Sequence, residues 1–501
     1  MKRQTTEQTV ATVVAASVLG LSLLGTAGCS KARAKYTPPV STPMAKAQTW
    51  SAPLGGGEAA KPVDGQALSQ WWAVLHDPFL TSLEERAVTG NLDLKKAEAV
   101  IRQVRAQRNY AQLGLLPSVS GSASATGSHM GSDVGPGGAS GTSSVSIDAS
   151  WEPDFFGKLH GAVTAYDADL GAAQESLRDV LVSLTAEVAL NYVSVRSYQA
   201  QIAITEANLK SFEQTYDVAV AQYQSGLATE LDTAQARMNV QSTRATLPAL
   251  QTNLQSAIHH IAVLLGERPG AVNAELAEVR PVPVAPLAVA VGVPADLLRR
   301  RPDIRGAERQ VAAQTARLGV ARADLYPSFT LSGSLGLTST SISKLFTPEA
   351  LLASIAGSVQ HTIFDRRKIL QNIDIQDAVL EQNVTTYESS VLTAMEDVEN
   401  ALVAFAKEQV RREAIREASI AARQASKIAN DLYAAGLKDF LNVLDTQRSL
   451  LNLENDQAQS EAAVTADLIR LYKALGGGWN SAAAGAPAAP GVKSSATESS
   501  R

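Results

Sequence analysis

Two acidic residues lie close together in RPDIRGAERQ (residues 301 to 310), namely Asp303 and Glu308. Such a pair could supply a general acid and a general base for catalysis. A structural role explains the pair better, because Pro302 followed by Asp303 is typical of a helix start. An acidic side chain is stabilised there by the positive end of the helix dipole. We therefore expect no catalysis from these residues and do not expect an enzyme.

Other groups that could carry chemistry are sparse. His259 and His260 are adjacent, so on a helix they point to different sides and make a poor pair of metal ligands. The remaining histidines are scattered, and we predict no metal site. The sequence contains no Gly-rich loop followed by Lys, which is the motif that would indicate phosphate binding. The net charge of −5 is too small to suggest nucleic acid as a partner. We therefore expect no bound metal ion and no other cofactor.

The single cysteine, Cys29, has a position that explains it. A short basic start and an apolar run from Val10 to Leu24 precede it, which is the pattern of a signal peptide. This run is short for a membrane-spanning helix. The stretch GTAGCS (residues 25 to 30) resembles a lipobox, although Thr26 stands where Leu is usual. The cysteine would then carry diacylglycerol through a thioether together with an N-acyl chain. Ordinary signal cleavage beside an incidental cysteine is the alternative.

The segment that follows Cys29 is rich in Pro, Gly, Ala and Ser, which is typical of an extended tether. We predict a lipoprotein signal peptide at residues 1–28 and a lipidated N-terminus with its tether at residues 29–65. Ser30 resembles the signal for sorting to the outer membrane. A lipid anchor combined with a second membrane contact would hold the protein firmly, whereas one chain alone binds marginally.

Four short stretches alternate apolar residues with polar ones that are mainly Ser and Thr, as β-strands with two unlike faces do. They form two pairs: residues 119–125 with 145–151, and 329–335 with 355–363. A soluble sheet with one wet face and a membrane β-barrel with a water-filled lumen both fit this pattern. Four strands cannot close a barrel, and lipid does not tolerate open edges. The membrane alternative therefore requires several chains to share one barrel, and three chains would give twelve strands.

Two proline-free runs, residues 157–224 and 365–435, predict helices of about 70 residues that are roughly 100 Å long. A compact domain has no room for such a helix. From Leu380 to Phe405 the apolar residues step by four and three, which is a stripe like that of a coiled coil. Hydrophobic residues make up 45% of the chain but aromatic residues only 5%, which suits closely packed helices. A fibrous coiled coil is the alternative, but it would not carry two membrane-like hairpins.

The same order of elements occurs twice, at an offset of 210 in residue number. Asp93 and Glu98 recur as Asp303 and Glu308, and Tyr223-x-x-Gly226-Leu227 recurs as Tyr433-x-x-Gly436-Leu437. A chance match would not keep one offset over separate landmarks, so we predict two copies of one unit. Repeat 1 spans residues 66–280 with a hairpin at about 117–152. Repeat 2 spans 281–475 with a hairpin at about 327–364, and residues 476–501 are predicted to be a disordered tail.

Three stretches resemble the TolC/OprM family of NodT type, whose members are outer-membrane channel lipoproteins of resistance-nodulation-division (RND) export systems. They are WW followed by DPFL at 71–80, NLDL at 91–94, and LLRRRPDIRGAERQVAAQTARLGVARADLYPSF at 297–329. The resemblance covers about residues 60 to 480. It implies a mainly α protomer with a membrane β part, built from long coiled-coil helices and two β-hairpins. It also implies a homotrimer that forms a 12-stranded β-barrel, continued by a periplasmic α-helical barrel.

The resemblance further implies a docking end at the turns between each long helix and its return helix. The glycines there suit a chain reversal, and a plain helix–helix turn is the alternative. Six turns in a trimer would meet a periplasmic adaptor (membrane fusion) protein that serves an inner-membrane RND transporter. The residues concerned are Gly226, Leu227, Ala228 and Thr229, and then Gly436, Leu437 and Lys438.

A gate is implied as well, because Leu441, Asp445 and Arg448 match the residues that line the family's periplasmic constriction. Steps of four and three place all three on one helix face. The first copy has Leu231, Gln235 and Met238 there, without charge. Tyr433 matches a tyrosine that holds the coils together, and Asn442 stands where TolC has a second acidic gate residue. The alternative is an exposed Asp445–Arg448 salt bridge, worth about 0.3–0.5 kcal/mol.

We therefore expect a passive, gated export duct in the bacterial outer membrane, lipid-anchored and with its helical barrel in the periplasm. Its cargo would be small molecules such as drugs, delivered by the inner-membrane pump and the adaptor. Two alternatives stay open. One is a duct for polypeptides or oligosaccharides in an ABC-type system, and the other is a structural coiled-coil lipoprotein without a pore. Ion conductance separates the duct from the second alternative.

Overall fold

The computed structural model describes residues 36–37, 68–134, 137–286 and 300–479. The chain divides into two compact units. We call residues 1–41, 97–176 and 303–390 the sheet unit, and residues 42–96, 177–302 and 391–501 the core unit. The predicted signal peptide, Cys29 and the predicted tether lie outside the described residues, apart from Tyr36 and Thr37.

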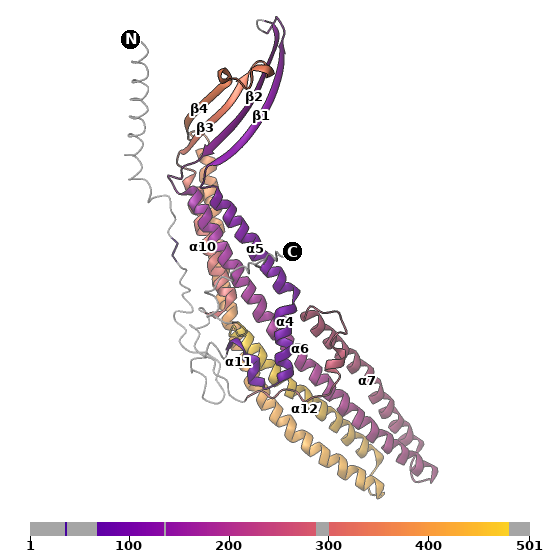
Figure 1. The fold of residues 1–501 in the computed structure, drawn as a ribbon. Coiled ribbons are helices and arrows are strands. Elements are labelled where there is room, and N and C mark those ends of the chain that lie inside the picture. Colours follow the sequence, from indigo (N-terminus) through magenta and orange to yellow (C-terminus); the bar gives the residue numbers. More distant parts are fainter. Residues whose placement is uncertain (1–35, 38–67, 135–136, 287–299, 480–501) are drawn as a thin grey trace, which may run out of the picture. The chain divides into compact units, whose positions relative to one another are not determined.

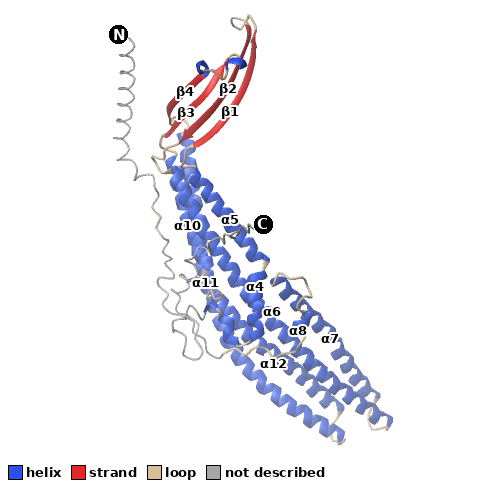
Figure 2. Ribbon diagram, viewed as in Figure 1, coloured by secondary structure: helices blue, strands red, loops and turns tan. Residues whose placement is uncertain are grey.

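Helices dominate the described residues, and four strands accompany them (Figure 2). None of the described helices has both the length and the apolar character that a membrane-crossing helix needs. In chain order the elements are η1 (Trp71–Leu75), α4 (Pro78–Gly90), α5 (Leu92–Leu113), β1 (Ser118–Met130), β2 (Gly138–Trp151), α6 (Lys158–Gln224), α7 (Glu230–Leu264), α8 (Asn273–Leu276), α10 (Pro302–Ala323), β3 (Ser328–Ser339), η2 (Ile342–Lys344), η3 (Pro348–Ala350), β4 (Leu351–Gln360), α11 (Arg366–Ala434) and α12 (Phe440–Ala474).

The bounds of these elements repeat at the predicted spacing. The starts of α5 and α10 are offset by 210 in residue number (302 − 92), and so are the starts of α7 and α12 (440 − 230). The two predicted long helices are present as α6 of 67 residues and α11 of 69 residues. The order of helix, hairpin, long helix and return helix therefore occurs twice.

Strands β1 to β4 form one antiparallel sheet in chain order, and Figure 1 shows them side by side. Within each hairpin the register is the same once the offset is applied. Ser118 pairs with Ser150 in the first, and Ser328 pairs with Gln360 in the second. Because side chains alternate along a strand, this register places all the predicted apolar positions on one face. Strands β1 and β4 are the two edges of the sheet.

The opposite face of the sheet carries hydroxyl groups that bond across the strands. Ser122 and Ser146 lie 2.9 Å apart between their hydroxyl oxygens, and Ser124 and Ser144 lie 2.8 Å apart. Such cross-strand hydroxyl pairs stabilise an antiparallel sheet. The sheet thus has one apolar face and one hydroxyl-rich face, as the alternation predicted.

The fourth strand is shorter than predicted. The alternation continues to Ile363, but β4 ends at Gln360. Gln360 pairs with Ser328, the first residue of β3, so the partner strand offers nothing opposite the residues that follow. The alternating sequence pattern predicts which side chains share a face. The length of the strand depends instead on how far its partner strand extends. Residues 361–365 instead connect the sheet to α11.

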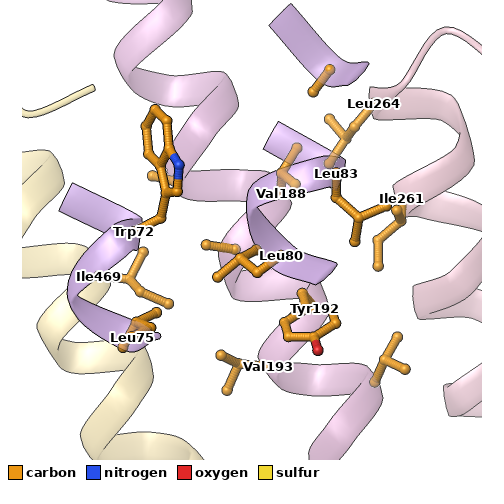
Figure 3. Packing of buried hydrophobic residues seen from close by; sticks show 14 of the residues in the cluster. Trp72, Leu75, Leu80, Leu83, Val188, Tyr192, Val193, Ile261, Leu264 and Ile469 are labelled. Atoms are coloured by element: carbon orange, nitrogen blue, oxygen red, sulfur yellow. The ribbon is translucent and has the colours of Figure 1, made fainter. Parts of the chain in front are cut away.

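A large cluster of buried apolar side chains lies in the core unit. In α4 the buried residues Leu80, Leu83 and Ala87 recur at helical spacing, so one face of this helix is covered. Fully burying a leucine side chain stabilises the fold by about 1.5–3 kcal/mol. Figure 3 shows Leu80 and Leu83 of α4 near Val188 and Tyr192 of α6 and near Ile261 and Leu264 of α7. Ile469 of α12 belongs to the same cluster and lies beside Trp72 and Leu75 of η1.

Asp77 explains why α4 begins where it does. Its Oδ1 accepts hydrogen bonds from the backbone N–H groups of Phe79 at 2.9 Å and Leu80 at 3.1 Å, which makes it the N-cap. Its Oδ2 accepts a bond of 2.6 Å from the hydroxyl of Tyr192 on α6. Burial, followed by this bond to Asp77, raises the pKa of Tyr192 to about 12. The cap therefore also joins two helices of the core unit.

The predicted disordered tail begins too early. Residues 476–479 are buried in the core unit, and the N–H of Gly478 donates to the carbonyl oxygen of Leu68 at 2.9 Å. Arg178 lies 5.0 Å from the centre of the Trp479 ring. Three consecutive glycines suggested disorder, but here they permit close packing, since a Cβ on Gly478 would lie 2.5 Å from Oγ1 of Thr185. Residues 480–501 lie outside the described residues.

Candidate functional site

The two turns between long helix and return helix have the same geometry. In the first, the N–H of Leu227 donates to the carbonyl of Gln222 and that of Gly226 to the carbonyl of Tyr223. The second turn makes the same pair of bonds from Leu437 and Gly436, and both glycines have positive φ, 74° and 70°. This is a Schellman motif, which satisfies the last carbonyls of a helix and needs glycine at the left-handed position. Sequence reasoning predicted both turns.

The return helices begin differently in the two copies. Thr229 caps α7 in a reciprocal capping box with Asp232, whereas Asp439 caps α12 without a side-chain hydrogen bond. A capping box satisfies two backbone donors that the helix itself leaves unpaired. The first turn is thus tied more firmly to its return helix than the second.

The residues predicted to dock an adaptor stand out from these turns. The leucine that follows each glycine is largely exposed, 80% for Leu227 and 70% for Leu437. Gly226, Thr229, Gly436 and Lys438 are exposed as well, and Ala228 is half-buried. An exposed leucine at both turns gives each copy a small apolar contact point.

The three predicted gate residues share one exposed face of α12. Leu441 is 66% exposed, and Asp445 and Arg448 are exposed on the same side. Of the first-copy positions, Leu231 is exposed to a similar extent, 63%. The shared face agrees with the steps of four and three. The Asp445 carboxylate forms no ion pair within the described part of the chain.

Arg448 binds another helix instead of Asp445. Its Nε donates to Oδ1 of Asn239 on α7 at 2.7 Å. The structure therefore does not contain the Asp445–Arg448 salt bridge along α12 that was the alternative. Asn239 is 5% exposed while Arg448 is exposed, so this bond to a charged donor is partly buried. A hydrogen bond with one charged partner contributes about 1.5–3 kcal/mol.

Tyr433 lies in a second, smaller apolar cluster of the core unit, next to Phe440, Val443 and Leu444. Its ring centre lies 5.2 Å from that of Phe440. Burial, followed by the charge of Asp232, raises the pKa of the Tyr433 hydroxyl. Tyr433 thus packs helices together and does not line the exposed face of Asp445.

Sequence reasoning missed three residues of this region: Asn239, Phe440 and Gln447. Gln447 donates to Oγ1 of Thr215 on α6 at 2.8 Å and ties α12 to that helix. The repeat offered one signal, since Phe440 corresponds to Glu230 in the first copy. An aromatic residue in only one copy indicates that the two return helices, α7 and α12, pack differently at their starts.

Asp303, Glu308 and His259 each make a hydrogen bond within the fold. Asp303 lies in the first turn of α10 and its Oδ1 accepts from the N–H of Ile304 at 2.9 Å. Glu308 accepts a bond of 3.1 Å from the hydroxyl of Tyr36. His259 bonds to Gln255 one turn away on the same helix. Across the described ranges, no group of three or more His, Cys, Asp or Glu side chains is placed to hold a metal ion.

The fold and these turns define an outer-membrane channel of the efflux type, and comparison with known proteins agrees. The family described as outer membrane efflux protein matches residues 83–267 and again residues 293–477. The starts of the two matches differ by 210 (293 − 83), and so do their ends (477 − 267). The chain belongs to this family. It is an outer-membrane channel component of an efflux system.

Curated relatives cover most of the chain. Nodulation protein T of Rhizobium leguminosarum bv. trifolii is 32% identical over 416 residues, 82% of this chain and 88% of the relative. The toluene efflux pump outer membrane protein TtgF of Pseudomonas putida is 30% identical, over 82% of this chain and 85% of its own length. The pyoverdine export outer membrane protein OpmQ, also of Pseudomonas putida, is 32% identical, over 85% of this chain and 92% of its own length.

Solved structures show the same fold. The outer-membrane channel OprN is 34% identical with a TM-score of 0.81, covering 89% of this chain and 99% of its own. The open state of the MtrE outer membrane channel of Neisseria gonorrhoeae has a TM-score of 0.75 at 25% identity, with coverage of 89% and 98%. The chain therefore has the tunnel fold of outer-membrane efflux channels.

Proposed function

We propose that three copies of this chain form a gated, passive duct that exports small molecules through the outer membrane. The three sheets would close one 12-stranded barrel in the membrane, and the long helices would continue it as a barrel in the periplasm. Energy would come from an inner-membrane RND transporter, with a periplasmic adaptor between that pump and the duct.

The single observation that carries the proposal is the four-stranded sheet with two open edges and two unlike faces. Backbone groups at an open edge have no hydrogen-bond partner in lipid, so a membrane sheet must close on itself. A barrel with an apolar outer face and a polar lumen suits these faces. Ring closure by identical copies leaves no edge unpaired.

A lipid on Cys29 would add a second membrane contact to the barrel. The cysteine follows an apolar signal-like run and is the only one in the chain. Diacylglycerol and N-acyl chains together bind a bilayer much more firmly than a single acyl chain does. The proposed anchor is independent of the pore and can be tested by labelling with radioactive palmitate.

The turns at Gly226–Thr229 and Gly436–Lys438 are the proposed docking places for the adaptor. Their exposed leucines, Leu227 and Leu437, would fit between the hairpin helices of such a partner. The exposed face with Leu441, Asp445 and Arg448 is the proposed gate. Three Asp445 carboxylates around a narrow axis would repel one another, which would make the closed state easy to open.

Small molecules such as drugs are the proposed cargo. This follows from the relatives whose names state toluene and pyoverdine as exported compounds. A wide, water-filled duct selects little by itself, so the inner-membrane pump would choose among substrates. Loss of the chain should then raise the accumulation of such compounds in the cell.

Planar-bilayer recording of the purified full-length protein tests the proposal, with native mass spectrometry of the same preparation. We expect a mass of three chains and discrete single-channel currents. A folded trimer that carries no current under any voltage would overturn the duct and favour a structural coiled-coil lipoprotein. Export of polypeptides by the reconstituted assembly, without export of small molecules, would overturn the proposed cargo.

A further inference from the structure

The four strands of the sheet carry one carboxylate. Asp148 on β2 is the only Asp, Glu, Lys or Arg within the described strands β1 to β4. His129 on β1 is the only other side chain on these strands that titrates near neutral pH, and the alternation along β1 places it on the apolar face. The sheet therefore has one fixed charge, and no basic side chain on its hydroxyl-rich face neutralises that charge.

Asp148 lies on the hydroxyl-rich face among serine side chains. The strand register places it between Ser120 of β1 and Ser334 of β3. Its Oδ2 accepts hydrogen bonds from the hydroxyl of Ser146 at 2.8 Å and from that of Ser122 at 3.3 Å. Hydrogen bonds with an ionised acceptor are stronger than those between neutral groups. The serine hydroxyls therefore hold the carboxylate in a defined position on this face.

The charge of Asp148 also decides which face of a membrane sheet can meet water. An ionised side chain that faces hydrocarbon is costly, so such groups are directed to a water-filled interior. A transmembrane barrel has its apolar side chains towards lipid and its polar side chains towards the lumen. Asp148 is half-buried within the chain, so its carboxylate stays accessible from this face. In the proposed duct it would line the lumen.

The two hairpins differ in charge at this position. The residue that corresponds to Asp148 in the second copy is Ser358 (148 + 210), which lies on the same face of β4 and pairs with Thr330. A barrel of three chains would thus carry three carboxylates at one level of its wall, and neutral hydroxyls at the three equivalent positions.

We propose that Asp148 gives the duct a preference for cations, both inorganic ions and cationic organic molecules, over anions of similar size. The inference rests on the proposed duct and adds a residue that selects by charge within it. Carboxylates on a lumen wall raise the local concentration of cations and lower that of anions. Rings of Asp or Glu act in this way in cation-selective pores. This preference does not depend on the shape of the cargo.

Screening by salt limits how far the charge acts. The Debye length is about 30 Å at 0.01 M salt and about 3 Å at 1 M salt. The field of the Asp148 carboxylates therefore extends far into the lumen at low salt and stays close to the wall at high salt. We expect the preference for cations to be clear at low salt and to disappear near 1 M. A preference caused by the width of the lumen would not depend on salt in this way.

Reversal potentials in planar bilayers measure this preference directly, with KCl at about 10 mM on one side and about 100 mM on the other. Every protein in the series carries Asp445→Ala, so that the charge of the proposed gate does not contribute. The test variant adds Asp148→Asn, which keeps the size of the side chain and an oxygen that accepts from the serines. The control adds Ser358→Asn, which places the same amide at the corresponding position without removing a charge. A fourth protein adds Ser358→Asp, which doubles the number of carboxylates at this position of the hairpins.

We expect Asp148→Asn to reduce the reversal potential at least twofold, Ser358→Asn to leave it unchanged, and Ser358→Asp to increase it. Conducting channels with the same reversal potential before and after Asp148→Asn would overturn the inference and leave the duct in place. An equal reduction by Ser358→Asn would also overturn it, because the effect would then not come from charge.

Native mass spectrometry of each preparation reports whether the variant forms the trimer. If Asp148→Asn does not assemble, Ser358→Asp decides the question, and an unchanged reversal potential in that protein would contradict the inference. Folded trimers that carry no current in any member of the series would instead overturn the proposed duct, and the inference with it.

Discussion

Arg448 and Asn239 tie the two return helices together, one from each repeat copy. The Nε of Arg448 on α12 donates to Oδ1 of Asn239 on α7 at 2.7 Å. Arg448 lies about one helical turn beyond Asp445, so this bond forms next to the proposed gate. A charged group of the gate face is therefore engaged between the helices and is not paired with the acidic residue of its own helix.

Replacing Asn239 by alanine should loosen this tie. Arg448 would lose a partly buried acceptor, at a cost of about 0.5–1.5 kcal/mol because water can reach its exposed guanidinium. We expect longer and more frequent open events in single-channel recordings. The Asn239→Asp variant keeps an acceptor and adds an opposite charge, so its currents should resemble those of the wild type or be smaller. Equal currents in all three proteins would show that the tie does not hold the gate.

Removing the Asp445 carboxylate should change the gate through charge. The side chain is exposed and has no ion-pair partner within the described residues. We expect the Asp445→Ala protein to show clearly larger currents, with a greater contrast at low ionic strength because salt screens exposed charges. The matched control is Gln235→Ala, at the corresponding position of the first copy. A gain in current from Gln235→Ala as large as from Asp445→Ala would argue against a charge effect.

Glu84 makes the stability of the core unit depend on pH. Its carboxylate is fully buried in α4, and neither oxygen has a hydrogen-bond partner within the described residues. Burial raises the pKa of Glu84 well above its ordinary value. The folded protein therefore binds a proton that the unfolded chain has already released above a pH of about 4.3. The free energy of unfolding should fall as pH rises from there towards the folded pKa.

The Glu84→Met variant should remove this dependence. We expect its midpoint of thermal unfolding to exceed that of the wild type at pH 7.5, with a smaller difference at pH 5. A buried polar group without a partner costs about 1–3 kcal/mol, which sets the scale of the gain. Its exposed neighbour gives the control, Glu85→Met, which should change neither the midpoint nor its slope with pH. A wild-type midpoint independent of pH would contradict the prediction.

Gly90 and Gly266 allow two chain segments of the core unit to touch. A Cβ on Gly90 would lie 2.1 Å from the carbonyl oxygen of Leu265, and one on Gly266 would lie 2.3 Å from that of Gly90. Backbone cannot yield as a flexible side chain can, so Gly90→Ala should lower stability by about 1–3 kcal/mol or prevent folding. The control Gly306→Ala meets only an ordinary contact at 3.7 Å. Thermal unfolding and the yield of folded protein measure the difference.

Two truncations test the disordered tail that the sequence predicts. A chain that stops after Trp479 keeps the residues packed in the core unit, so its thermal midpoint should equal that of the full chain. A chain that stops after Leu475 loses the bond from Gly478 to Leu68 and the Trp479 ring beside Arg178. We expect a clearly lower midpoint for the shorter protein. Equal midpoints would mean that residues 476–479 contribute nothing to the folded state.

The sequence by itself determined the repeat, the two hairpins and the two long helices. The β-hairpins and the helices can be predicted from their short hydrophobic periods. The repeat can be predicted from its constant offset, and none of these predictions requires knowledge of a tertiary contact. The turns were predicted from their glycine motif, and the shared face of Leu441, Asp445 and Arg448 from residue spacings of four and three. The lipid anchor at Cys29 stays a prediction, since it lies outside the described residues.

Only the tertiary structure decided which side chains meet across helices. Arg448 binds Asn239, which lies far earlier in the chain, and no spacing along α12 indicates that partner. Tyr433 is buried at 8% exposure while its repeat counterpart Tyr223 is 46% exposed, although both stand in the same local motif. Glu84 and Trp479 are buried for the same reason. Burial depends on what the rest of the chain places against a residue, and a local pattern does not contain that information.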